Sequence, residues 1–116
     1  MRILIVEDNK DFLYFICSIA RLACSTNEIF QAETLNEALP HLSNNMDLVI
    51  SDFEFPIGNF PTFLPYLQKE KCKFILQSAE CSHLKTYDSI LQVGTVYKDS
   101  NYMQNMLKLL RLNYIS

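Results

Sequence analysis

Short apolar runs of strand length alternate with segments of helical periodicity along almost the whole chain. The sequence predicts five strands, at residues 3–6, 28–32, 48–51, 74–77 and 95–97. It predicts five helices after them, at residues 9–25, 34–43, 60–69, 82–91 and 101–113. Strands that alternate with helices pair in parallel through right-handed crossovers. The predicted fold class is therefore α/β, with a doubly wound, five-stranded parallel sheet.

Two of the predicted helices carry local signals at their ends. Thr34 and Glu37 have the spacing of a capping box, which opens the second helix. Pro40 removes one backbone hydrogen bond inside that helix and is expected to kink or shorten it. Pro61 suits the first turn of the third helix, whereas Pro65 lies deeper and is less favourable.

Length and composition indicate one domain over residues 1–116 and exclude several functions. Hydrophobic residues make up 49% of the chain, which is enough for a packed core. Only two glycines are present, so a glycine-rich nucleotide loop is disfavoured. A net charge of -3 lacks the basic patch of a nucleic-acid-binding protein. No linker, repeat or low-complexity segment divides the chain.

The four cysteines indicate a reduced, cytoplasmic protein. None forms a C-x-x-C pair, and Cys17 and Cys24 lie seven residues apart in an apolar helical pattern. Structural thiols are therefore favoured over a metal or redox site. The sequence shows no signal peptide and no membrane span.

Three acidic residues follow predicted strands. Glu7 and Asp8 follow the first strand, and Asp52 follows the buried third strand. Ligands of open α/β sheets bind beyond the carboxyl ends of the strands, so these carboxylates should converge if the two strands are neighbours. Converging carboxylates raise one another's pKa unless a cation neutralises them. An all-oxygen ligand set favours a hard ion such as Mg²⁺.

Ser78 and Lys98 follow the fourth and fifth strands. A hydroxyl, an ammonium group and a metal around one carboxylate suit an incoming phosphoryl group, whose oxygens they would share. Asp52 could then act as the nucleophile and form an acyl phosphate.

Four segments in this order resemble the receiver domain of two-component response regulators. They are ILIVEDN, DLVISDFEFP, LQSA and VGTVYKD, which begin at residues 3, 47, 76 and 93. The resemblance covers essentially the whole chain. It implies a flavodoxin-like sheet with strand order 2-1-3-4-5 and five helices on both faces.

The resemblance also implies roles for single residues. Asp52 matches the phosphoacceptor, and Asp8 matches a direct Mg²⁺ ligand. Glu7 matches the acid that usually acts through a metal-bound water, and Glu54 would give its backbone carbonyl to the metal. Ser78 matches the Ser/Thr of the family's site, and Lys98 matches its lysine.

The partners implied by the resemblance are proteins. The phosphoryl donor would be a phosphohistidine on a sensor histidine kinase or a histidine phosphotransfer protein, and the signal would be altered binding to a downstream protein. The chain is not expected to be an enzyme beyond its own phosphorylation and slow dephosphorylation at Asp52. We expect a monomer or weak dimer without membrane or direct nucleic-acid contact. No output domain follows the last helix, so a stand-alone receiver is expected.

Two positions differ from the family pattern, and two others bear on how long a phosphoryl group would last. Thr95 stands where the family usually has an aromatic residue that reports phosphorylation, and Tyr97 faces the same side of the strand. Asp99 stands where a proline is common. By resemblance, Glu54 and Glu80 flank the path of the hydrolytic water and affect the lifetime of the phosphoryl group.

Two alternatives remain open from the sequence. One is a pseudo-receiver, an interaction module that keeps the fold without phosphorylation, which Thr95 favours. The other is a Mg²⁺-dependent nucleic-acid enzyme of the toprim type, which Glu7, Asp52 and Glu54 fit loosely. The low basic charge, Ser78 and Lys98 fit this second alternative badly.

Overall fold

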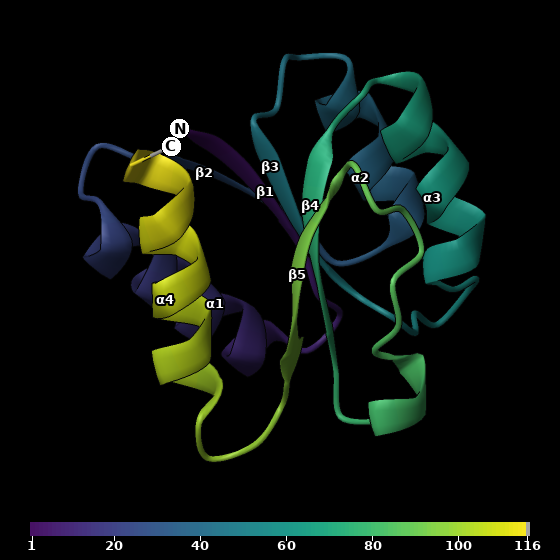
Figure 1. Cartoon of the computed structure of the whole chain (residues 1–116). Coiled ribbons are helices and arrows are strands. Elements are labelled where there is room, and N and C mark those ends of the chain that lie inside the picture. Colours follow the sequence, from purple (N-terminus) through teal and green to yellow (C-terminus); the bar gives the residue numbers. More distant parts are fainter. Residues whose placement is uncertain (116) are drawn as a thin grey trace.

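The carboxyl ends of five parallel strands lie at one edge of the sheet in the computed structural model, which describes residues 1–115 and the side chains of residues 1–112 (Figure 1). The strand order is β2-β1-β3-β4-β5, as predicted. The strands are β1 (Arg2–Val6), β2 (Glu28–Ala32), β3 (Leu48–Asp52), β4 (Lys73–Ser78) and β5 (Gln92–Tyr97). All four pairs of neighbours are parallel.

Helices cover both faces of this sheet (Figure 1). On one face lie α1 (Lys10–Ala23) and α4 (Tyr102–Ile115), which contact each other. On the other lie α2 (Leu35–Leu42) and α3 (Phe60–Lys69). Among the described residues, no helix has both the length and the apolar character needed to cross a membrane.

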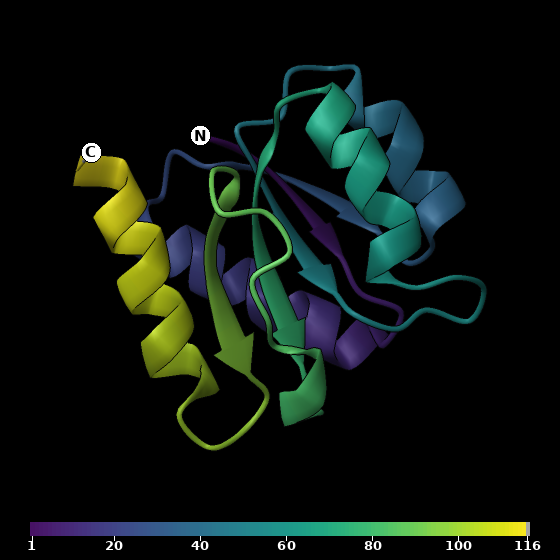
Figure 2. The same ribbon diagram turned by 45° about the vertical axis from the view of Figure 1, so that its right-hand side comes forward.

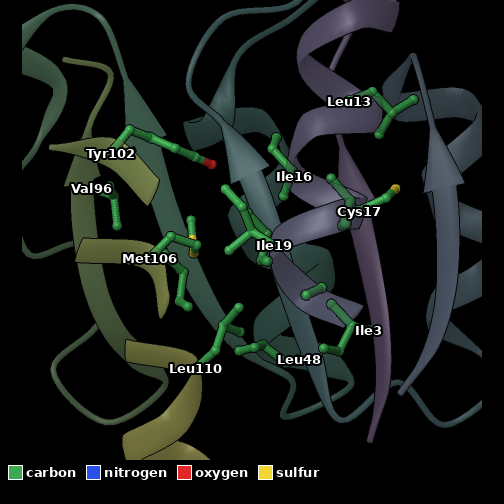
Figure 3. Close-up of a cluster of buried hydrophobic side chains, with 14 residues drawn as sticks. Ile3, Leu13, Ile16, Cys17, Ile19, Leu48, Val96, Tyr102, Met106 and Leu110 are labelled. Atoms are coloured by element: carbon green, nitrogen blue, oxygen red, sulfur yellow. The ribbon is translucent and has the colours of Figure 1, made fainter. Parts of the chain in front are cut away.

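Each face of the sheet has its own apolar core, because the central strands are buried on both sides. The core under α1 and α4 contains buried side chains from both helices and from β1, β3, β4 and β5 (Figure 3). The core under α2 and α3 is rich in phenylalanine, and Phe60, Phe63 and Phe74 are among its fully buried members. Cys17 and Cys72 are buried in these two cores as free thiols.

Side-chain caps fix where three of the helices begin. Asn9 Oδ1 accepts a hydrogen bond from the backbone N–H of Phe12 at 3.0 Å. Thr34 Oγ1 accepts from the Glu37 N–H at 3.1 Å, which confirms the predicted start of α2. Asn59 caps α3 in the same way. It follows Gly58, whose φ of 92° lies in the region that favours glycine and turns the chain after β3.

The predicted helix at residues 82–91 is wrong. The structure has a short 3₁₀ helix, η1 (Cys81–His83), and then an irregular segment that runs back beside β4 and β5 (Figure 2). Residues 1–115 therefore contain four α-helices rather than five. In this segment the side chain of Ile90 is 86% exposed rather than packed in a core.

Side chains in this segment take the backbone hydrogen bonds that a helix would use. Asp88 Oδ1 accepts from the Leu91 N–H at 2.8 Å. The Gln92 side chain accepts from the Tyr87 N–H and donates to the Lys85 carbonyl, both at 2.7 Å. Local side-chain bonds of this kind compete with helix formation, which explains why the helical pattern of the sequence misleads.

Candidate functional site

The sheet order places the predicted acidic residues side by side. β1 and β3 are separated in sequence by β2 but are neighbours in the sheet, where Val6 pairs with Ser51. Glu7 and Asp52, the next residues along, therefore end adjacent strands. Asp52 in turn pairs with Gln77 on β4, so the end of β4 lies next to Asp52 in the sheet.

Three carboxylates converge at this edge. One oxygen each from Glu7, Asp8 and Asp52 lies within 4.8 Å of the others. Glu7 is 1% exposed and Asp52 is 9% exposed, whereas Asp8 is open to solvent. The predicted convergence is confirmed, and the all-oxygen donor set fits a hard divalent cation.

Lys98 supplies the positive charge that meets Asp52 in this structure. Its Nζ lies 2.7 Å from Glu7 Oε1 and 3.1 Å from Asp52 Oδ1. The same ammonium group lies 4.6 Å from the centre of the Phe12 ring, in cation–π geometry. Because an ionised carboxylate in an apolar setting is costly, this bridge explains how Asp52 can end a buried strand.

One lysine does not fully compensate two buried carboxylates. Burial raises the pKa of Glu7 to about 7, against the opposing hydrogen bond from Lys98, and the charge of Asp52 adds to the increase. Burial also raises the pKa of Asp52, again opposed by Lys98. The acidic cluster can therefore accept a further cation with a gain in electrostatic stability.

A buried hydrogen-bonded chain connects this cluster to α4. Gln77 Nε2 donates to Glu7 Oε1 at 3.3 Å, and the Tyr102 hydroxyl donates to Gln77 Oε1. Figure 3 shows Tyr102 extending from the start of α4, among the side chains of the first core. Burial, followed by the charges of Glu7 and Asp52, raises the pKa of Tyr102 well above its ordinary value. Sequence reasoning missed both residues, although a glutamine within an apolar strand was a usable signal.

Ser78 lies at the end of β4 and is buried with 4% exposure. Its Oγ accepts a hydrogen bond from the Glu80 N–H at 3.0 Å and lies 2.9 Å from His83 Nδ1. The Lys98 N–H donates to the Ser78 carbonyl at 2.9 Å, so the two predicted phosphoryl-binding residues are tied through their backbones.

His83 was not predicted to be part of the site. Its ring stacks on Phe53 with the centroids 3.9 Å apart, and its Nε2 lies 3.7 Å from Glu54 Oε1. The sequence offered no motif for it, because its position depends on η1 replacing the expected helix.

Glu54 lies outside the group of three carboxylates. It forms an antiparallel bridge with Asn59, and its exposed side chain faces His83. Its backbone carbonyl as a metal ligand stays a prediction. The Glu80 side chain is likewise exposed.

Thr95 and Tyr97 share one side of β5, as predicted, on either side of the buried Val96. Both are exposed, since none of the helices within residues 1–115 covers this part of the sheet. Tyr97 has a raised pKa, first because of its hydrogen bond with Cys81. Whether Tyr97 replaces the switch aromatic stays a prediction.

Solved structures resemble this chain over its whole length, whereas no family model and no curated protein matches its sequence. The response regulator protein TrrA from Thermotoga maritima, solved in complex with Mg²⁺-BeF, is 30% identical with a TM-score of 0.74. That match covers 94% of this chain and 97% of TrrA. The receiver domain of the hybrid histidine kinase CckA is 25% identical with a TM-score of 0.65, and the match covers 96% of this chain and 99% of that domain.

A third structure supports the fold alone. The chemotaxis response regulator CheY4 of Vibrio cholerae is 19% identical with a TM-score of 0.75, and the match covers 96% of each chain. With the identity and coverage of TrrA, these matches define the class: the chain belongs to the receiver domains of response regulators. This membership excludes the toprim alternative.

Proposed function

We propose that the chain takes a phosphoryl group from a phosphohistidine onto Asp52 and thereby changes which protein it binds. The observation that carries the proposal is the cluster of Glu7, Asp8 and Asp52 with Lys98 in direct contact. A carboxylate oxygen of Asp52 attacks the phosphorus, and the bond from phosphorus to the imidazole nitrogen breaks. The departing nitrogen keeps the electron pair, and because the other ring nitrogen of the phosphohistidine carries a proton, the donor leaves as neutral histidine.

Mg²⁺ is the cofactor that the donor set supports. Asp8 and Asp52 would bind it directly, Glu7 through a water and Glu54 through its backbone carbonyl. When bound, the ion neutralises negative charge on the phosphoryl oxygens. The protein contributes the fixed positions of the carboxylates, because Glu7 is held by the Asn9 N–H at 3.1 Å and by Gln77.

Lys98 and Ser78 would bind the phosphoryl oxygens that the metal leaves free. Lys98 already bridges Glu7 and Asp52, so its ammonium group would need only a small movement to reach an oxygen of a phosphoryl group bound to Asp52. Ser78 would donate its hydroxyl proton to another oxygen. TrrA, solved with Mg²⁺-BeF, supports a metal-dependent phosphoryl site in this family.

The partners of this reaction would be a sensor histidine kinase or a histidine phosphotransfer protein, together with a downstream protein. We propose no catalysis on other substrates, beyond the slow loss of the phosphoryl group from Asp52. The buried thiols of Cys17 and Cys72 support a reducing compartment such as the cytoplasm.

Mass spectrometry tests the proposal directly. The protein is incubated with Mg²⁺ and a small-molecule phosphodonor, and its intact mass is measured with time. We expect the mass of one phosphoryl group to appear with wild type, and none with Asp52→Asn or without Mg²⁺. An unmodified mass for folded wild-type protein at saturating donor would contradict the proposal.

Two observations favour the pseudo-receiver instead. The segment that should form the fourth helix is irregular, and Thr95 replaces the switch aromatic. In that case the unphosphorylated surface would bind the partner, and the same mass experiment would separate the two functions.

A further inference from the structure

The Ser78 hydroxyl has two neighbours before any phosphoryl group arrives. A hydroxyl has one proton to donate and two lone pairs that accept. One lone pair accepts from the Glu80 N–H at 3.0 Å. The contact with His83 Nδ1, at 2.9 Å, uses either the second lone pair or the single proton. Which of these it uses decides whether Ser78 is ready to act as a donor.

His83 is held in place on several sides, although it lies outside any α-helix. Its ring stacks on Phe53, the residue that follows Asp52, with an interplanar angle of 14°. Its backbone carbonyl accepts a hydrogen bond from the Tyr87 hydroxyl at 3.1 Å. The side chain is 20% exposed. The imidazole therefore has a defined orientation toward Ser78.

The tautomer of the ring decides the direction of its contact with Ser78. Glu54 Oε1 lies 3.7 Å from Nε2, which is too far for a hydrogen bond but close enough for the carboxylate to attract an N–H on that side. We take the tautomer with its proton on Nε2. Nδ1 is then an acceptor, so the Ser78 hydroxyl donates its proton to His83. A proton shared with Nδ1 is not free to be donated to a phosphoryl oxygen.

We propose that His83 is a positioning residue that competes with the phosphoryl group for the hydroxyl proton of Ser78. This inference rests on the proposed function of Ser78 as a phosphoryl donor group. Binding of the phosphoryl group requires the Ser78 O–H to turn away from Nδ1, and the lost hydrogen bond opposes phosphorylation. His83 therefore stabilises the resting state of the site.

Two substitutions distinguish the contribution of the Nδ1 acceptor from that of the stacked ring. His83→Phe keeps the flat ring that stacks on Phe53 but removes the acceptor. His83→Asn loses the stack but returns a hydrogen-bond acceptor near Nδ1. If His83 competes for the proton, the affinity for beryllofluoride should depend on whether an acceptor is present at Nδ1. If the ring is merely structural, this affinity should depend on whether the stack on Phe53 is kept.

The experiment measures the affinity of beryllofluoride, a phosphoryl mimic, at saturating Mg²⁺ for wild type, both His83 variants and Ser78→Ala. We expect His83→Phe to bind about twofold to tenfold more tightly than wild type, the value of one net hydrogen bond. His83→Asn should bind close to wild type. In the Ser78→Ala background, His83→Phe should have no effect, because the shared proton is gone.

Imidazole ¹⁵N shifts in the free protein distinguish the possible failures. We expect an unprotonated Nδ1 whose shift changes in Ser78→Ala. A protonated Nδ1 overturns the proposed competition but leaves the proposed function standing. The same holds if His83→Phe binds beryllofluoride no more tightly than wild type does. An effect of His83→Phe that persists in Ser78→Ala also overturns the competition. Absence of beryllofluoride binding to wild type overturns the proposed function and the inference with it, while the ¹⁵N shifts still report the resting hydrogen bond.

Discussion

The two halves of the site are built in different ways. In the acidic half, the buried carboxylates of Glu7 and Asp52 end paired strands and share Lys98 through charge-assisted hydrogen bonds. The hydroxyl half joins Ser78, which is buried at the end of β4, to His83, which lies in a segment without an α-helix. The sheet fixes the first half, whereas local side-chain contacts fix the second.

This difference predicts where the free energy of the site lies. Breaking a buried ion pair leaves an uncompensated charge and is strongly destabilising. Removing a neutral side chain that makes one or two hydrogen bonds costs less, about 0.5 to 1.5 kcal/mol for each bond. Substitutions in the acidic half should therefore change stability, and those in the hydroxyl half should mainly change ligand affinity.

The largest effect is expected for Lys98→Ala. It leaves Glu7 and Asp52 close together without their shared cation, so the free energy of unfolding should fall by roughly 2 to 4 kcal/mol in metal-free buffer near neutral pH. Urea unfolding followed by circular dichroism measures this. Lys108→Ala, which removes an exposed lysine from α4, is the matched control and should be neutral. Equal stability of the two variants would show that the bridge does not stabilise the fold.

The pH dependence of stability comes next. Glu7 has a folded-state pKa of about 7, above its ordinary value of 4.5, so the folded protein binds its proton more tightly than the unfolded chain. Stability from this group is full below about pH 4.5 and is lost as pH rises through about 7. We expect a decline on the order of 2 kcal/mol in metal-free buffer. Glu7→Gln should flatten it.

Chemical denaturation at a series of pH values checks this slope. Glu28→Gln, at an exposed acid on β2, serves as the control and should keep the decline. If stability rises over the same pH range in wild type, the account of the acidic half is wrong.

Tyr102→Phe tests the buried chain that leads from the cluster to α4. The ring is kept and the hydrogen bond to Gln77 is lost, so a destabilisation of about 1 to 2 kcal/mol is expected. Tyr66→Phe changes an exposed tyrosine on α3 and should be silent. A thermal melt that does not distinguish the two variants would show that the Gln77 contact contributes nothing.

The smallest effect is expected in the irregular segment. Ile90 is 86% exposed, so Ile90→Ser should change the free energy of unfolding by less than about 0.5 kcal/mol. In a packed fourth helix the same substitution would remove core contacts and cost several times more. A large loss of stability would indicate that residues 84–91 pack as the sequence predicts.

The same contrast explains what could be predicted from the sequence. Asp52 ends a continuous apolar run, and buried parallel strands carry their last residue to a shared edge, so the acidic half follows from strand patterns. The strand order was implied by the resemblance to receiver domains, and the α2 cap followed from the spacing of Thr34 and Glu37. The irregular segment that replaces the predicted helix at 82–91 could not be foreseen. The Asp88 and Gln92 side chains take backbone hydrogen bonds there that a periodic pattern does not reveal. His83 joined the site only through that change.

The central claim is that both halves bind one phosphoryl group on Asp52. An NMR titration of ¹⁵N-labelled protein with beryllofluoride in the presence of Mg²⁺ tests it most directly. The account predicts that the signals of Glu7 and Lys98 and those of Ser78 and His83 change along one saturating curve, which is lost without Mg²⁺ and in Asp52→Asn. Changes in only one half, or the same changes without Mg²⁺, would contradict it.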